Sequence, residues 1–96
     1  MLLDILKRKH FCDVFLLIKD EPKSFNEIQK KLNMYPDTLN RRIKELLGYD
    51  LIESVVIQVE GRDRIKYQLT QKGKDILPEI EEFVRLSKMI ENRIKS

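Results

Sequence analysis

Apolar residues recur at helical spacing in the first half of the chain and alternate with polar residues in its middle. Residues 2–19 follow the helical period until the basic run at residues 7–10 interrupts it, so we expect a bend or a break there. The segment 20–23 ends this helix, because a proline disfavours helical geometry in the residue before it. Ser24 and Glu27 have the spacing of a capping box, which predicts that a second helix begins at Ser24.

The second helix is predicted to end near residue 32, and a third follows after a turn at residues 33–36. Pro36 or Asp37 begins the third helix, since the fixed φ of proline and the charge of aspartate both suit a first turn. Gly48 is expected to end it with a positive φ. The buried stripe of this helix is expected to be Leu39, Ile43, Leu46 and Leu47.

A change of period marks the next elements. Residues 51–59 are apolar and rich in β-branched side chains, and apolar residues alternate with polar ones over residues 64–69. Two such runs around a glycine-containing loop at residues 60–63 predict a β-hairpin. A third short strand is expected near Lys23.

A long helical pattern closes the chain. Thr70 is the expected N-cap, and residues 71–94 form one helix or two, depending on whether Pro78 kinks the helix or begins a new segment. Apolar residues at spacings of four and three, interrupted by Ser87, are typical of a coiled-coil-like dimer seam; packing on the first helix is the alternative. The predicted dimer interface is Leu2, Leu3, Leu6, Ile80, Phe83, Ser87, Ile90 and Ile94.

The predicted fold is therefore α+β: a winged helix-turn-helix with a β-hairpin wing and a long C-terminal helix. Residues 1–70 form the winged-helix domain, with the helix-turn-helix at residues 24–47 and the wing at residues 51–70. Residues 71–96 form a dimerisation element that packs with residues 2–19. This order of elements offers one helix to a DNA major groove and one hairpin to the neighbouring backbone or minor groove.

Length and composition narrow the class of protein. Ninety-six residues suffice for one modest core, and a net charge of +3 is compatible with nucleic acid without being strong evidence for it. One cysteine and one histidine exclude an intrachain disulfide and do not form a zinc-site pattern. The N-terminus lacks the order of a signal peptide, and the apolar run at residues 14–18 is far below the ~20 residues of a membrane span. We expect a cytoplasmic protein with no cofactor and no membrane partner.

Candidate DNA-binding side chains lie opposite the buried stripe of the third helix and on the wing. Arginine grips guanine O6 and N7, asparagine does the same for adenine, and lysine or threonine takes phosphates. Arginine on a narrow loop enters the minor groove, and Arg62 is the stronger wing candidate because Arg64 has Asp63 and Glu60 to pair with. The alternative is that these are ordinary solvated faces. The predicted DNA-binding residues are Tyr35, Asp37, Thr38, Asn40, Arg41, Lys44, Arg62, Arg64 and Lys66.

Four fragments carry a family resemblance: SFNEI, TLNRRIKEL, DLIES and YQLTQKGKDILP. From about residue 10 to residue 83 the chain resembles HxlR-like winged-helix regulators, within the broader MarR/PadR/ArsR-type group. The last fragment follows the pattern Y-x-L-T-x-K-G-x-x-L, with Ile76 in place of the final leucine; this pattern is a common exit from the wing into the final helix of that group. The resemblance implies a homodimer that binds a palindromic operator through the third helix and the wing, usually without a cofactor. The chain departs from the family pattern in having no Trp and in placing Cys12 within the first helix, so the family's thiol-sensing role is not carried over.

The predicted function is sequence-specific binding of double-stranded DNA by a homodimeric transcriptional regulator. The alternative is a winged helix that serves as a protein-interaction module in a transcription or replication assembly, which the weak net charge permits. An enzyme is not expected, because the lone His10 has no catalytic partner pattern and the chain has no Gly-rich phosphate loop. Cys12 is expected to be a small buried hydrophobe, with an intersubunit disulfide or an oxidation switch as the alternative. No feature of the sequence identifies a pocket for a small effector.

Overall fold

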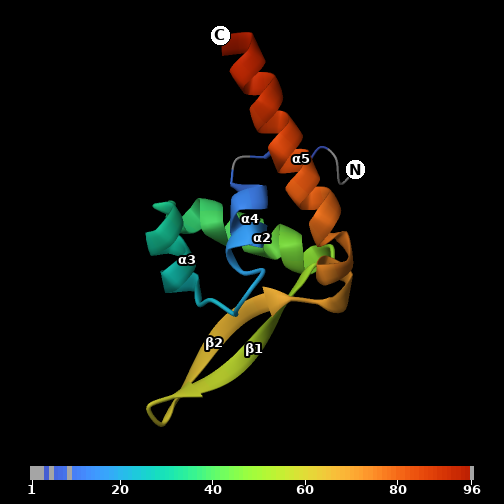
Figure 1. Ribbon diagram of the computed structural model, residues 1–96. Helices are drawn as coiled ribbons and strands as arrows, with labels where there is room; N and C mark the ends of the chain where they lie inside the picture. The colour runs from blue at the N-terminus through green and yellow to red at the C-terminus, as the bar shows by residue number, and fades with distance from the viewer. Residues whose placement is uncertain (1–3, 5, 9, 96) are drawn as a thin grey trace.

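Residues 4, 6–8 and 10–95 are described by the structure, a computed structural model shown in Figure 1. The helices of the N-terminal half are followed by one antiparallel hairpin and a long C-terminal helix, which is the predicted α+β order and confirms the fold class. A small helical body carries the hairpin on one side, and the last helix projects past the body on another (Figure 1). The elements are α2 (Phe11–Leu17), α3 (Phe25–Leu32), α4 (Pro36–Gly48), β1 (Ile52–Val59), β2 (Arg62–Leu69) and α5 (Gln71–Lys95).

The predicted break in the N-terminal helix is confirmed. Asp4 and Leu6 are helical, residues 7 and 8 form a turn and a bend, and α2 begins at Phe11. His10 precedes α2 with a left-handed φ of 67°, a conformation that no helix can continue.

The capping box at the start of α3 is also confirmed. The Ser24 Oγ accepts a hydrogen bond from the Glu27 backbone N–H at 3.2 Å, and the Glu27 Oε1 accepts one from the Ser24 backbone N–H at 3.0 Å. Two N–H groups that a helix start leaves free are thereby satisfied. The helix ends at Asn33, whose φ of 52° turns the chain toward α4.

Helix α4 begins at Pro36, as predicted, but two expectations about it are wrong. Leu47 is 40% exposed and does not belong to the buried stripe, whereas Arg42 is only 7% exposed and does. Gly48 is the last helical residue rather than a cap of positive φ. The left-handed residue is Asp50, with a φ of 58°, because the chain turns there to return the Leu51 N–H to the Leu46 carbonyl.

The hairpin turn is tighter than the sequence suggested. Glu60 and Gly61 form a two-residue turn with φ values of 53° and 76°, the pair of positive angles that suits the twist of the flanking strands. Arg62 and Asp63, expected in the loop, are instead the first residues of β2. The expected third strand is a single antiparallel bridge, in which the Tyr67 N–H donates to the Lys23 carbonyl at 2.7 Å and the Lys23 N–H donates to the Tyr67 carbonyl at 3.0 Å.

Helix α5 runs through Pro78 without interruption, so the one-helix alternative is correct. Thr70 caps it as predicted: its Oγ1 accepts from the Gly73 N–H at 3.0 Å and donates to the Asp50 carbonyl at 2.6 Å. No helix in the described part of the chain is long and apolar enough to cross a membrane.

The core lies between α2, α3, α4, the base of the hairpin and the first half of α5. Each of these elements contributes apolar side chains to the core, and their burial stabilises the helical body. Among the described residues, the outer half of the hairpin and the C-terminal half of α5 contribute no side chain to this core. The buried apolar residues are Phe11, Val14, Phe15, Ile18, Ile28, Met34, Leu39, Ile43, Leu46, Leu51, Ile52, Leu69 and Ile80.

Candidate nucleic-acid interface

The outer face of α4 presents the polar side chains that the helical period predicted. Asp37, Asn40, Arg41 and Lys44 are exposed, and Thr38 is half-buried beside them. Their positions recur every three or four residues, so they form one surface opposite the buried leucine and isoleucine stripe. At the entrance of the helix, the side chain of Tyr35 is 82% exposed. This face therefore offers donors, acceptors and cations to a partner.

Two of the three cations of α4 are available. Within the described residues, neither Arg41 nor Lys44 forms an ion pair. The third, Arg42, turns inward, and its Nε lies 3.2 Å from the Glu45 Oε1. Glu45 also pairs with Arg8, which precedes α2.

Sequence reasoning missed the inward role of Arg42, although a signal for it was present. Arg42 lies three residues after Leu39 and four before Leu46, which places it on the buried side of the same helix. Its long aliphatic stem fits that side, and Glu45 one turn later supplies the counter-charge. Arg42 is therefore a structural residue of α4 rather than part of its outer face.

The hairpin carries a second pair of cations. Arg62 and Arg64 are exposed residues of β2, opposite Val59 and Ile57 of β1, and their side chains alternate with that of Asp63. In the described chain no ion pair joins Arg64 to Asp63 or to Glu60, the partners that the sequence offered for it. Within the described chain neither Arg62 nor Arg64 forms an ion pair, and both lie in the half of β2 next to the turn.

Lys66 differs from the other predicted DNA-binding residues. Its side chain is only 21% exposed, and its Nζ lies 3.2 Å from the Glu27 Oε1 at the start of α3. A lysine that is already paired with a carboxylate is a weaker ligand for phosphate than an unpaired one. Lys66 therefore ties the hairpin to the helices instead of standing free.

The residues predicted for a dimer interface fall into different environments. Leu2 and Leu3 lie outside the described residues. Leu6 is half-buried against the core, and Ile80 is 4% exposed within it, so Ile80 has no surface left for a partner. Phe83 is half-buried. The exposed members are Ser87, Ile90 (58%) and Ile94 (78%), and Leu86 (43%) and Met89 (41%) of the same helix are exposed as well.

The single cysteine and the single histidine have local roles in this structure. Cys12 is half-buried, and burial, with a smaller contribution from Asp13, raises the pKa of its thiol to about 11. A thiol of that pKa is protonated at neutral pH and is a poor nucleophile. The His10 Nδ1 lies 3.3 Å from the Asp13 Oδ2, across the first turn of α2. Among the residues that the structure describes, no three His, Cys, Asp or Glu side chains gather to hold a metal ion.

Comparisons with known proteins agree with the geometry. A family model described as HxlR-like helix-turn-helix matches residues 5–95. A Methanocaldococcus jannaschii protein named as an HTH-type transcriptional regulator is 33% identical over 91 residues, which cover 86% of this chain and 81% of that protein. Two crystal structures, each 21% identical, show the same fold. A PadR-like regulator from Bacillus cereus has a TM-score of 0.78 (97% of this chain, 98% of that chain), and a possible HxlR family factor from Thermoplasma volcanium has one of 0.75 (96% and 83%).

Proposed function

The chain belongs to the HxlR-like helix-turn-helix family, and from that membership we propose that it binds duplex DNA sequence-specifically as a homodimeric transcriptional regulator. In this proposal α4 enters the major groove, and the hairpin contacts the neighbouring backbone or minor groove. The observation that carries the proposal is the outer face of α4, where Arg41 and Lys44 stand unpaired beside Asn40 within the described chain.

Each side chain of this face has a counterpart in DNA. Arg41 has the geometry to bind guanine O6 and N7 with two hydrogen bonds, and Asn40 can do the same for the N6 and N7 of adenine. Lys44 is a phosphate ligand one turn further along the helix. Arg62 and Arg64 add two exposed cations on the hairpin, which suit a minor-groove or backbone contact.

The exposed apolar stripe of α5 supports the homodimer. Leu86, Ile90 and Ile94 recur every four residues on a helix that projects past the body (Figure 1). A second copy of the chain would bury this stripe, and a two-fold axis between the two α5 helices would turn the two α4 helices toward one face of the DNA. Half-sites of the operator would then be related by two-fold symmetry and lie about 34 Å apart.

The function is tested by selecting duplexes from a randomised pool with the wild-type chain. We expect enrichment of a palindrome whose half-sites are centred about one helical turn apart, since each subunit presents an identical α4. A bound population without a shared sequence would contradict sequence-specific regulation.

The homodimer is tested by the double substitution Ile90→Glu with Ile94→Glu. We expect light scattering to give a dimer mass for the wild type and a monomer mass for this variant, because two carboxylates replace exposed apolar contacts of the stripe. Val56→Glu with Ile65→Glu is the matched control, since these two residues are comparably exposed, at 65% and 61%, but lie on the hairpin; it should keep the dimer mass. A monomeric wild type would refute this part of the proposal.

One observation favours a second candidate, a protein-interaction module. Val56 and Ile65 are paired across the hairpin and are 65% and 61% exposed. A protein partner could bury these two apolar side chains, whereas contacts to the phosphate backbone of DNA are made by polar and cationic groups. A protein-binding hairpin would leave the wild-type chain unable to retain duplex DNA at physiological salt.

A further inference from the structure

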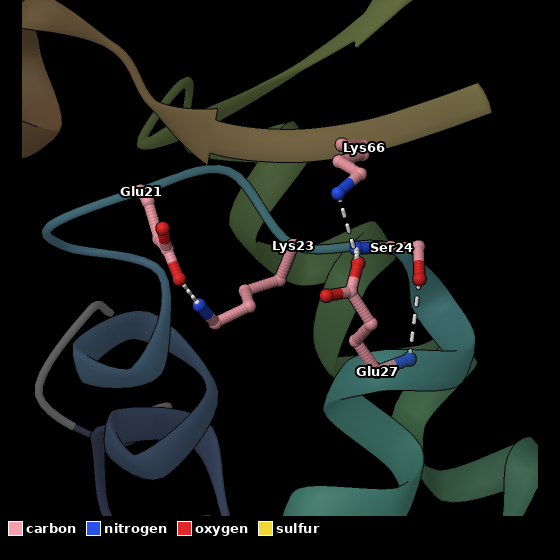
Figure 2. A network of polar contacts seen from close by, with 5 residues as sticks. All are labelled: Glu21, Lys23, Ser24, Glu27 and Lys66. Atoms are coloured by element: carbon pink, nitrogen blue, oxygen red, sulfur yellow. Dashed lines mark hydrogen bonds and ion pairs between the residues drawn. The ribbon is translucent and has the colours of Figure 1, made fainter. Parts of the chain in front are cut away.

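We propose that Glu27 and Lys66 are positioning residues, whose ion pair holds the hairpin at a fixed angle to the helix-turn-helix so that Arg62 and Arg64 meet DNA together with α4. This inference rests on the proposed function, and it gives Lys66 a role other than contact with phosphate. Figure 2 shows the two side chains reaching toward each other from β2 and from the start of α3.

The outer hairpin has little else to fix its direction. Its base is buried through Ile52 and Leu69, but Val56 and Ile65 further out are 65% and 61% exposed. A two-stranded hairpin without a covered face is only marginally rigid. Its angle to the body must therefore be set by the contacts near its base.

Two kinds of contact join β2 to the start of α3 and to the loop that precedes it. The backbone bridge pairs Lys23 with Tyr67 through two hydrogen bonds, of 2.7 and 3.0 Å. One residue nearer the tip, the Lys66 Nζ reaches the Glu27 Oε1 at 3.2 Å. Within the described chain, this ion pair is the polar contact between hairpin and helices that lies closest to the tip.

The capping box holds the Glu27 carboxylate in place independently of its ion pair with Lys66. The same Oε1 atom accepts the Ser24 backbone N–H at 3.0 Å, so the capping box fixes the side-chain rotamer (Figure 2). The pKa of Glu27 is lowered to about 2, first by that hydrogen bond and further by the ammonium group of Lys66, and the carboxylate is therefore charged at any physiological pH. Because the acceptor is already ordered, the ion pair costs less conformational entropy than a pair of mobile surface side chains.

A neighbouring pair provides a comparison. Glu21 and Lys23 also form an ion pair, but both belong to the loop before α3, and in the described chain neither side chain forms a hydrogen bond or an ion pair with a hairpin residue (Figure 2). Glu21 and Glu27 thus carry the same charge in the same part of the molecule, and only Glu27 is bonded to the wing.

The direction in which Glu27→Gln changes the affinity for DNA distinguishes a positioning role from a simple electrostatic one. Removing a carboxylate close to a DNA-binding surface reduces repulsion of the phosphates and by itself strengthens binding. If the carboxylate positions the wing, its removal weakens binding instead. Glutamine at residue 27 still accepts the Ser24 N–H, so the helix start is retained.

The experiment measures the affinity of Glu27→Gln, Lys66→Met and the double variant for a duplex enriched by the wild type. We expect each single variant to bind about two- to fivefold more weakly and the double variant to bind no worse than either, because the two substitutions remove one and the same contact. Glu21→Gln, the matched control, should bind at least as tightly as the wild type. Unchanged or tighter binding by Glu27→Gln, or additive losses in the double variant, would overturn the proposal.

A second readout needs no DNA and would decide the inference even if the proposed function failed. The Tyr67 N–H of the bridge should exchange with solvent faster in Glu27→Gln than in the wild type or in Glu21→Gln, because the adjacent tether is gone. An unchanged exchange rate at Tyr67 would refute the tether, whereas failure of the wild type to bind any duplex would refute only the regulator function.

Discussion

Replacement of Gly73 by alanine is expected to lower the free energy of unfolding by about 3 kcal/mol, near the upper end for a single substitution. A Cβ atom at this position would lie 2.2 Å from the Leu51 carbonyl oxygen and 3.2 Å from its carbonyl carbon. Both are backbone atoms, so no side chain can move aside. The same oxygen accepts the Thr70 N–H at 3.1 Å, and moving it would weaken the joint where α5 leaves the hairpin. Urea denaturation followed by circular dichroism measures the loss.

Gly48 provides the opposite control. A Cβ atom there meets nothing within 4 Å, and the residue is helical, so Gly48→Ala should stabilise the protein by about 0.5–1 kcal/mol. Equal losses in both variants would show that the close approach of α5 to Leu51 is not what requires a glycine. Gly73 is also the glycine of the YQLTQKGKDILP fragment, and the contact with Leu51 is a physical reason for its place there.

The double substitution Arg41→Ala with Lys44→Ala is expected to weaken binding to the wild type's own operator by about a hundredfold. A base contact by arginine and a phosphate contact by lysine each contribute on the order of 1–2 kcal/mol, and the two positions lie on one exposed surface. Neither side chain forms an ion pair within the described residues, so truncation should leave the fold intact. Fluorescence anisotropy at one fixed salt concentration measures the effect.

Lys88→Ala with Lys95→Ala is the matched control. It removes the same net charge from exposed positions on the far half of α5. Because salt screens exposed charges beyond about 10 Å, this variant should bind within about twofold of the wild type. A comparable loss in both double variants would mean that total charge, rather than the α4 face, governs affinity.

Elements that depend on local chemistry could be predicted from the sequence. Ser24 and Glu27 specify the start of α3 through the capping box, Pro36 begins α4, and Thr70 caps α5, because each effect needs only residues within one helical turn. The alternation of residues 64–69 likewise indicated β2, although it did not show that Arg62 and Asp63 pair in the strand.

The errors came from contacts between distant parts of the chain. Asp50, rather than Gly48, takes the left-handed conformation because Leu51 must hydrogen-bond to Leu46, which the identity of one glycine does not reveal. Lys66 looked like a free cation because its partner, Glu27, belongs to a different element. Leu47 has the helical period of the buried stripe and is nevertheless 40% exposed, because periodicity gives the face of a helix and not how far other elements cover it.

The most direct test of the central claim, that the outer face of α4 contacts DNA, is the salt dependence of operator binding by the wild type and by Arg41→Ala with Lys44→Ala. The wild type should lose affinity linearly on a plot of log affinity against log salt, since cations that neutralise phosphates release bound counterions. If Lys44 contacts a phosphate and Arg41 a base, the slope of the variant should be smaller in magnitude by about one. An affinity and a salt slope identical to those of the wild type would contradict the account.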